Sequence, residues 1–592
     1  VMSQAFISKG RLSLIVASVI LAFAILIARL FFLHVLDSAR LQGFAQDVRK
    51  SVRVLPSERG AIFDRHGNIL ATTQTTYTLG VDPNFLKSSE RKKWQHLAFI
   101  LEMPYADLVS VMERKYRAES GRMIRWAPLA KNVDLKTYAA VMHLGITGVY
   151  GNRKNQRVYP GKQLAAHMIG YINHESQAVS GIEQMCDYYL RGQDGWVESE
   201  KDGRRRELAH KRSREIAPVN GNDVFLTLDQ RIQSSVEAEI ERLVDRYQPE
   251  GISIIVSRPE DGSLLALANY PTYDLNAFYN TRLYPIAYQR NRAISDIFEP
   301  GSTFKIVPAS GVLNESIVAV DEVFETGQSH ALYQNRTVRL PSDHKRFDQL
   351  SMGEIVIKSS NRGAAHLGMR LGDQGLYDYA ASFGFGSLTE LGLRGEVSGT
   401  LNSIDTWDGL TIAHMPMGHA VAGTPLQIHY AMSVIANRGI LMKPKIIERI
   451  RDAEGATVLE YPAVQKHRVI DASVAEQMSF LLNRVVHSGT AKRARIEGYS
   501  VAGKTGTTQK LIDGRYSNKA HVASFSGFFP AENPEVVITV IVDEPKMKVG
   551  SGYGGVVAAP AFKTIAEDCI RYLGIRRSEY SQEWIANRKF QP

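Results

Sequence analysis

The chain has 592 residues, of which 44% are apolar and 22% charged, and its formal net charge is +10. This length exceeds one ordinary domain, and the composition excludes a disordered chain. Two cysteines, Cys186 and Cys569, are too few for a disulfide framework, and no cysteine or histidine spacing is typical of a metal site. We therefore expect unpaired thiols, no metal and no cofactor.

The run from Leu12 to Leu36 is apolar apart from Arg29, His34 and two serines. At ~1.5 Å per residue it is longer than the roughly 30 Å hydrocarbon core of a bilayer, and it exceeds the apolar part of a cleaved signal peptide. It predicts one transmembrane helix over residues 12–36. A basic balance suits nucleic acid, anionic lipid or an anionic wall polymer, and the span favours the last two, so we expect no nucleic acid.

The segment after the span contains both strand-like and helix-like patterns. Residues 52–78 alternate apolar and polar positions around glycine turns, which predicts strands joined by a tight turn. Residues 88–145 are expected to be helical, and residues 158–170 to form a turn and a short helix. The basic residues 201–215 indicate a solvated ribbon or linker, with contact to an acidic partner as the alternative.

From Asn222 onward the pattern is that of a larger α+β domain. Val224 to Leu228 reads as a strand, and Asp229 as the N-cap of a helix whose apolar stripe runs to Val244. Two apolar hairpin strands follow. Near the end of the chain come two more strands and a helix from Pro560 to Leu573. These elements predict an antiparallel sheet packed between terminal and inserted helices.

A candidate catalytic serine lies in residues 298–306, which read FEPGSTFKI. Pro300 and Gly301 are typical of a turn that opens a helix. Ser302 and Lys305 are three positions apart and share one helix face. A lysine amine kept neutral by apolar neighbours can take the proton of a serine hydroxyl, which indicates a nucleophile and its base.

The Ser-x-x-Lys pattern also occurs at Ser89/Lys92 and Ser342/Lys345, but both pairs lie in polar segments and are expected on the surface. The match at Ser302 differs because two further motifs follow it in order. They are Ser359-Ser360-Asn361 and, in an apolar segment that reads as an edge strand beside a pocket, Lys504-Thr505-Gly506-Thr507.

This order resembles that of the penicillin-recognising serine acyl-transferases. Over nearly its whole length the chain is similar to class B penicillin-binding proteins, which are membrane-anchored peptidoglycan D,D-transpeptidases, and especially to their division (FtsI) type. Asn361 and the Phe-Glu-Pro-Gly-Ser sequence favour the division type over the elongation type. Further matches are Arg59-Gly60, Asp64-Arg65, Arg157-Val158-Tyr159-Pro160, Gly181-Ile182-Glu183, Gly395-Glu396, Tyr553-Gly554-Gly555 and Ala558-Ala559-Pro560.

The resemblance implies an α+β fold. It places a penicillin-recognising serine transpeptidase domain, an antiparallel sheet flanked by helices, on an extended β-rich pedestal with one N-terminal transmembrane helix. The implied parts are a cytoplasmic tail (1–11), the transmembrane helix (12–36), a pedestal of the penicillin-binding protein dimerisation type (37–220), the transpeptidase domain (221–575) and a C-terminal tail (576–592).

The resemblance also implies a role for each motif residue. Ser302 attacks the carbonyl of the penultimate D-alanine of a stem peptide, forms an acyl-enzyme and releases the terminal D-alanine, with Lys305 as the base. An amine from a neighbouring stem then takes the acyl group. By the same resemblance, Ser359 relays a proton, Asn361 holds the substrate and orders Lys305, and Lys504 supplies a positive field. Thr505, Gly506 and Thr507 are implied to bind the substrate carboxylate. The backbone N–H groups of Ser302 and Thr507 are implied to form the oxyanion hole.

The implied partners are peptidoglycan stem peptides, β-lactams, the lipid bilayer through residues 12–36, and a polytopic glycan polymerase with other division proteins. The implied location is the bacterial inner membrane at the division site, with a cytoplasmic N-terminus and a periplasmic catalytic domain. A count of flanking basic residues opposes this orientation, but long domains cross largely regardless of such charges.

Other activities are compatible with parts of the same motif set. A β-lactamase needs a group that activates water, and no Glu-x-x-x-Asn of that kind lies between Asn361 and Lys504. A D,D-carboxypeptidase differs only in its acceptor, water, and stays open. A sensor would need more than the eleven residues before the span, and an inert scaffold would tend to lose Lys305 or Lys504.

Arg362 departs from the family pattern, in which a small or apolar residue commonly follows Ser-x-Asn. We expect its side chain to point outward as a surface charge without effect on the chemistry. The alternative is that it points into the groove and favours acidic groups on a substrate or drug.

Overall fold

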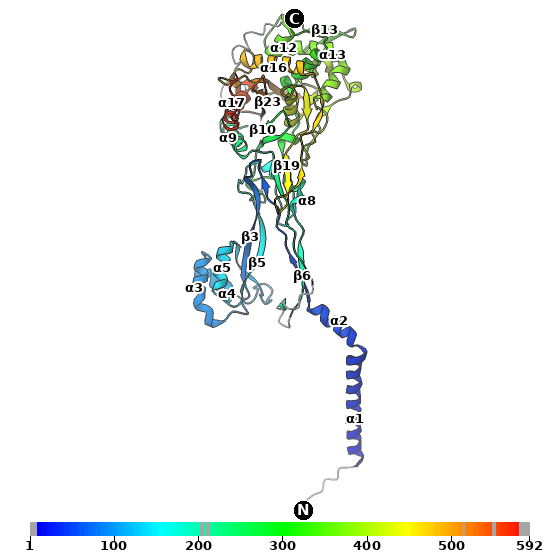
Figure 1. The fold of residues 1–592 in the computed structure, drawn as a ribbon, viewed down its shortest axis with the longest axis vertical. Coiled ribbons are helices and arrows are strands. Elements are labelled where there is room, and N and C mark those ends of the chain that lie inside the picture. The colour runs from blue at the N-terminus through cyan, green and yellow to red at the C-terminus, as the bar shows by residue number, and fades with distance from the viewer. Residues whose placement is uncertain (1–8, 202–206, 209–213, 513–514, 548–551, 579–592) are drawn as a thin grey trace, which may run out of the picture. The chain divides into compact units, whose positions relative to one another are not determined.

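The computed structural model describes residues 9–201, 207–208, 214–512, 515–547 and 552–578. The chain divides into two compact units, which are described separately (Figure 1). The first combines residues 1–58 with 191–221, and the second combines residues 59–190 with 222–592.

The first unit begins with α1 (Lys9–Phe31), a π-helical turn (Phe32–Leu36) and α2 (Ser38–Arg49). Among the described residues, one helix, Lys9–Leu36, is long enough and apolar enough to cross a membrane. None of its residues is buried. It contains the predicted span. A small antiparallel sheet follows, in which β6 (Gly195–Lys201) pairs with β1 (Lys50–Leu55), β7 (Glu207–Leu208) and β8 (Arg214–Ile216). Most of the basic stretch 201–215 lies outside the described residues.

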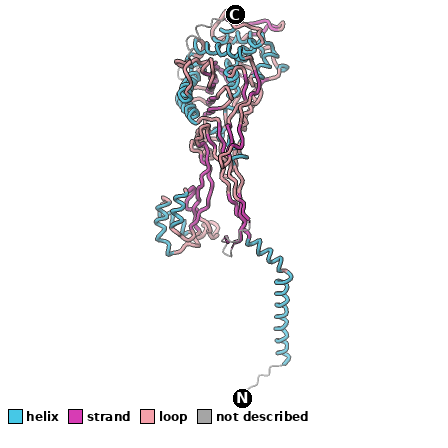
Figure 2. Tube along the Cα trace, in the orientation of Figure 1, coloured by secondary structure: helices cyan, strands magenta, loops and turns pink. Residues whose placement is uncertain are grey.

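The second unit contains a seven-stranded sheet in the order β20-β19-β9-β2-β3-β4, with β5 also paired to β3. Figure 2 shows β3 (Ile69–Val81) and β5 (Val149–Val158) as a long antiparallel ribbon. The remaining strands are β2 (Ile62–Phe63), β4 (Ala127–Val133), β9 (Asp223–Leu226), β19 (Ile447–Arg451) and β20 (Thr457–Glu460).

Residues 88–145 are only partly helical, and the prediction was wrong for residues 114–134, which contain no helix. The range 88–145 contains α3 (Trp94–Ile100), α4 (Tyr105–Glu113) and α5 (Leu135–His143), but also the strand β4. Leu129 and Val133 are buried and four residues apart, a spacing that would also place two residues on one face of a helix. Pro128 lacks the N–H that a helix interior requires, and it is tolerated in β4 because β4 is at an edge of the sheet.

Three of the family-like motifs meet in a buried ion network. The Glu183 carboxylate accepts from Arg59 Nε at 2.7 Å and from Arg157 Nε at 2.7 Å, and Arg59 Nη1 lies 2.6 Å from Asp187 Oδ1. Arg157 Nη1 also donates to the Gly60 carbonyl at 2.7 Å. Two cations face two carboxylates, so the charges balance and the network fastens β5 to the segment that leads into β2.

The second sheet of this unit has the order β11-β10-β24-β23-β22 and is antiparallel throughout. Its strands are β10 (Gly251–Ser257), β11 (Leu264–Tyr270), β22 (Ala502–Ile512), β23 (Arg515–Phe529) and β24 (Val536–Asp543). Every residue of β10 is buried, so helices cover both faces of the sheet. The motif strand β22 is at the edge, as predicted.

Two helices that are far apart in the sequence pack together beside this sheet (Figure 1). The first is α9 (Gln230–Tyr247), in which the Asp229 carboxylate caps the N-terminus and accepts from the N–H groups of Arg231 and Ile232. The second is α17 (Gly554–Leu573), whose Phe562 ring contacts Phe525 of β23 at 4.8 Å. The sequence predicted that this helix begins at Pro560, and it begins six residues earlier.

A tertiary contact explains this earlier start. The Gly554 N–H donates to Thr507 Oγ1 at 3.0 Å, so the first turn of α17 is anchored to the motif strand β22. Pro560 therefore lies inside the helix and not in its first turn, where its missing N–H would cost nothing.

The other two motifs lie between β11 and β22 in the chain. The remaining helices of this unit are α6 (Ala166–Ile169), α7 (Gly181–Met185), α8 (Asp187–Leu190), α10 (Arg292–Ser295), α11 (Ile306–Asn314), α12 (Met352–Lys358), α13 (Asn361–Ser382), α14 (Thr411–His414), α15 (Pro425–Ala436) and α16 (Ala472–His487). The remaining strands are β12 (Val323–Glu325), β13 (His330–Tyr333), β14 (Arg336–Arg339), β15 (Gln349–Ser351), β16 (Thr400–Leu401), β17 (Val421–Ala422), β18 (Ile440–Met442) and β21 (Gln465–Arg468).

Candidate active site

The Ser302 motif forms a 3₁₀ turn, Gly301–Lys305, that continues into α11. The turn begins at Gly301, which has a φ of +57°, in the left-handed region that favours glycine. A Cβ at Gly301 would lie 2.3 Å from Thr508 Oγ1 of β22, so the absence of a side chain lets the serine turn approach the strand. Ser302 itself is partly exposed, while Thr303 and Lys305 are buried.

A second glycine holds the same turn and was not identified from the sequence. The Gly301 N–H donates to the Gly418 carbonyl at 3.2 Å. Gly418 has a φ of +88°, and a Cβ there would lie 2.1 Å from the Gly301 carbonyl oxygen. This backbone contact joins segments far apart in the chain, so no local pattern indicates it.

The Lys305 amine is placed by the second motif. It is 2% exposed, and its Nζ donates to the Ser359 carbonyl at 2.6 Å and to Asn361 Oδ1 at 2.7 Å, with Ser359 Oγ at 3.2 Å. Ser359 ends α12 with a φ of 61°, a left-handed conformation that a serine adopts only when its surroundings impose it. The strained backbone turns both the carbonyl and the hydroxyl of Ser359 toward Lys305.

The third motif brings a second buried lysine to the same hydroxyl. Lys504 is fully buried, and its Nζ donates to Ser359 Oγ at 2.7 Å. The hydroxyl of Ser359 therefore lies between the amines of Lys305 and Lys504. The sequence predicted that these three residues belong to one site, and the structure brings them together.

The buried position changes the acid–base behaviour of both amines. Burial lowers the pKa of Lys305 well below its usual range, and the neighbouring Lys504 lowers it further. Burial also lowers the pKa of Lys504, to about 7. Desolvation disfavours the charged form of an amine, so a neutral Lys305 is accessible near pH 7.

The remaining motif residues lie along β22. Gly506 is close to the serine turn, because a Cβ there would lie 3.0 Å from the Pro300 carbonyl oxygen. Thr507 Oγ1 donates to the Gly506 carbonyl at 2.9 Å and accepts from Gly554 N–H. Thr505 Oγ1 lies 2.8 Å from Thr490 Oγ1, a partner that the sequence did not indicate. These contacts fix both threonine side chains beside the serine turn.

The segment around Asp343 also belongs to the site, although sequence reasoning missed it. The Asp343 carboxylate accepts from the Asn361 N–H, from Ser360 Oγ at 2.7 Å and from the Arg362 N–H at 3.3 Å. The Ser342 carbonyl accepts from Asn361 Nδ2 at 2.8 Å. A polar turn before a distant helix carries no signal for such a contact.

The two other Ser-x-x-Lys pairs lie on the surface as predicted, since Ser89, Lys92, Ser342 and Lys345 are exposed. The expected orientation of Arg362 was wrong. Its side chain does not extend freely into solvent, because the guanidinium donates to the backbone carbonyls of Pro341, Thr326 and Gly327.

An acidic residue just before the serine turn joins it to the start of β23. The Glu299 carboxylate lies 2.8 Å from His419 Nδ1 and accepts from Tyr516 Oη at 3.1 Å and from the Ala420 N–H at 3.0 Å. The segment from Gly418 to Ala420 thus contacts both Gly301 and Glu299 and holds the start of the serine turn.

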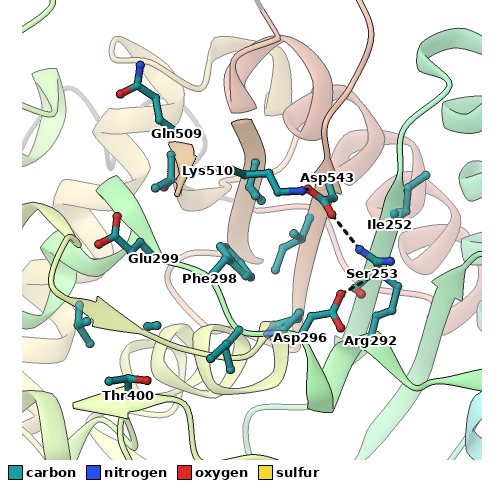
Figure 3. A pocket seen from close by; sticks show the side chains of 18 of the residues that line it. Ile252, Ser253, Arg292, Asp296, Phe298, Glu299, Thr400, Gln509, Lys510 and Asp543 are labelled. Carbon is teal, nitrogen blue, oxygen red and sulfur yellow. Dashed lines mark hydrogen bonds and ion pairs between the residues drawn. The ribbon is translucent and has the colours of Figure 1, made fainter. Parts of the chain in front are cut away.

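A pocket of about 420 Å³ lies beside the motifs but does not contain them (Figure 3). Phe298 and Glu299 line it, together with Thr508 and Lys510 of β22. Figure 3 shows Arg292 between Asp296 and Asp543, at 2.9 and 2.8 Å. Arg292, Asp296, Lys510 and Asp543 of its lining form ion pairs with one another, and the lining contains none of the residues that the three motifs predict to be catalytic. The predicted catalytic lysines therefore meet at Ser359 and not in this pocket.

Comparison with known proteins gives the family. The description "Penicillin binding protein transpeptidase domain" matches residues 252–567, more than half of the chain, and "Penicillin-binding Protein dimerisation domain" matches residues 54–226. The chain belongs to the class B penicillin-binding proteins. The predicted family and fold class are thus confirmed.

The relatives of this penicillin-binding protein match along almost its whole length. Stage V sporulation protein D of Bacillus subtilis is 30% identical over 571 residues, covering 96% of this chain and 86% of the relative. Peptidoglycan D,D-transpeptidase FtsI of Escherichia coli is 30% identical over 573 residues, covering 95% and 92%. The structure of penicillin-binding protein 3 from Mycobacterium tuberculosis complexed with aztreonam is 26% identical, with a TM-score of 0.68, covering 89% and 98%.

Proposed function

We propose that this penicillin-binding protein is a serine-type peptidoglycan D,D-transpeptidase and a β-lactam target. In the first step Ser302 attacks the penultimate D-alanine carbonyl of a stem peptide, the C–N bond breaks, and D-alanine leaves as an amine. In the second step an amine of a neighbouring stem attacks the ester and restores the Ser302 hydroxyl. The names of the relatives and the aztreonam complex of a similar structure support this activity.

One observation carries the assignment of roles. The Ser359 hydroxyl lies between two buried lysine amines, with Lys305 Nζ at 3.2 Å and Lys504 Nζ at 2.7 Å. Neutral Lys305 is the base that takes the proton of Ser302. A proton can then pass through the Ser359 hydroxyl to the leaving amine, while Lys504 supplies a donor and a positive field on the other side.

The other roles follow from the neighbours of these groups. Asn361 holds Lys305 through its Oδ1, and one Nδ2 hydrogen donates to the Ser342 carbonyl, so the second Nδ2 hydrogen is the one offered to the substrate backbone. Thr505, Gly506 and Thr507 on the edge strand β22 bind the terminal carboxylate of the substrate. The backbone N–H groups of Ser302 and Thr507 stabilise the oxyanion, each donor contributing roughly 3 kcal/mol to lowering the barrier.

The acceptor distinguishes cross-linking from simple hydrolysis. With a labelled pentapeptide stem and an amine acceptor, we expect mass spectrometry to detect the amide formed between the two, with release of D-alanine. The Ser302→Ala variant should form neither product. If the parent protein yields only the stem that has lost D-alanine, water is the acceptor and the protein is a carboxypeptidase.

We further propose a pedestal over residues 37–220 and a transpeptidase domain over residues 221–575, supported by the two matched family descriptions. The apolar helix Lys9–Leu36 anchors the protein in the inner membrane, with the N-terminus in the cytoplasm and the catalytic domain in the periplasm. The glycan polymerase and division proteins are its partners at the division site. A fluorescent fusion that spreads evenly around dividing cells, or a catalytic domain that resists protease added to the periplasm, contradicts this placement.

A further inference from the structure

Arg362 fastens two loop segments to the start of α13. Its Nε donates to the Pro341 carbonyl at 3.2 Å, and its Nη1 donates to the Thr326 and Gly327 carbonyls at 3.3 and 2.9 Å. Thr326 and Gly327 follow β12, and Pro341 follows β14. The guanidinium thus joins the start of the segment that leaves β12 to the end of the β13–β14 hairpin.

The segment from Pro341 to Asp343 touches the site directly. The Ser342 carbonyl accepts from Asn361 Nδ2 at 2.8 Å, and the Asp343 carboxylate caps the N-terminus of α13. Asn361 in turn receives a hydrogen bond from Lys305 Nζ at 2.7 Å. An unbroken series of contacts therefore leads from the Arg362 guanidinium to the Lys305 amine.

Most side chains of this segment face solvent. Ser342, His344, Lys345 and Arg346 are exposed, although the His344 ring contacts Tyr553 with ring centroids 5.6 Å apart, whereas Pro341 is buried and its carbonyl accepts from Arg362. A planar guanidinium can donate to carbonyls of two segments at once, because its donors are arranged in a rigid fork. A lysine ammonium is a single point and cannot span the same set of acceptors.

We propose that Arg362 is a positioning residue for the acyl-transfer reaction, holding the 341–343 segment so that Ser342 and Asp343 fix Asn361 against Lys305. The inference rests on the proposed roles of Lys305 and Asn361. It assigns a function to the position at which this chain departs from its family. It differs from a direct electrostatic role, because the guanidinium donates to backbone carbonyls of Pro341, Thr326 and Gly327.

The test measures the rate constant of acylation by a penicillin across a pH series in the detergent-solubilised full chain. We expect Arg362→Ala to lower this rate constant about tenfold or more, because small displacements of catalytic groups are costly, while the affinity of the initial complex is unchanged. Arg362→Lys, which reaches fewer carbonyls, should recover part of the rate. The control is Arg370→Ala, an exposed arginine on the same helix, which should behave like the parent.

The pH series separates positioning from a general loss of structure. The charged groups that act on Lys305 are Lys504, which lowers its pKa, and Asp343, which raises it. If Arg362→Ala releases Asp343, the pKa of Lys305 falls and the ascending limb of the profile moves to lower pH. Asp343→Asn keeps the shape of the carboxylate and removes its charge, so it should move the limb in the same direction. Adding Arg362→Ala to Asp343→Asn should then produce no further shift.

Each outcome decides the proposal. The proposal is overturned if Arg362→Ala keeps the parental rate constant and pH profile. It is also overturned if Arg362→Ala lowers the rate constant without shifting the profile and Arg362→Lys recovers none of that rate. If Arg362→Ala does not fold, Arg362→Lys carries the test, and parental values in both measurements contradict the proposal. Failure of the parent itself to be acylated would instead overturn the proposed function.

Discussion

Replacing Lys305 with arginine is expected to abolish acylation by β-lactams, lowering the rate constant by at least about 10³-fold. A guanidinium stays protonated at any usable pH, so it preserves the charge but cannot accept the Ser302 proton. The acceptors of Lys305 Nζ are also placed for a compact amine. They are the Ser359 carbonyl oxygen at 2.6 Å and Asn361 Oδ1 at 2.7 Å. A larger planar group cannot use them in the same way.

The measurement is single-turnover labelling with a fluorescent penicillin, followed from pH 6 to pH 9. Lys92→Arg is a matched control, because Lys92 belongs to a Ser-x-x-Lys pair that lies exposed on the surface. It should retain the parental rate. Substantial acylation of Lys305→Arg would show that Lys305 acts only as a cation and that another group is the base.

Replacing Lys504 with methionine should both slow acylation and move its pH profile. Methionine is close to lysine in length and suits a buried position, but it removes the donor to Ser359 Oγ, so we expect a loss of about 10²- to 10³-fold. Lys504, with a pKa of about 7, is charged in the acidic part of the profile and there lowers the pKa of Lys305. Removing this cation raises the pKa of Lys305, so the neutral base forms only at higher pH.

The ascending limb of the acylation profile is therefore expected at higher pH in Lys504→Met than in the parent. Lys546→Met, at an exposed lysine, serves as the control and should change neither the rate nor the limb. A limb that stays in place or moves to lower pH would mean that the two amines do not interact as their shared contact with Ser359 requires.

Local features of this fold could be predicted, because neighbouring residues determine them. Pro300 and Gly301 indicated the turn before Ser302, and Asp229 indicated the start of α9. The apolar residues around Lys504 indicated the edge strand β22. The order of the three motifs then identified Lys305 and Lys504, whose amines the structure brings together at the Ser359 hydroxyl.

Contacts between distant segments could not be predicted in the same way. Gly418 touches Gly301, Asp343 caps the helix that begins at Asn361, and Thr490 pairs with Thr505, yet none of these residues has a local pattern that names its partner. Tertiary contacts also overrode local preference in β4 and at the start of α17. Arg362 illustrates the same limit, since a charged residue after a catalytic turn reads as a surface charge until the carbonyls it binds are known.

The proposed reaction depends first on Ser302 being the nucleophile. The most direct measurement is peptide mapping by mass spectrometry after the full chain has been labelled to completion with a β-lactam. The expected result is one adduct per chain, located on Ser302 and absent from the Ser302→Ala variant. An adduct on Ser89, Ser342 or Ser359 in place of Ser302 would contradict the account.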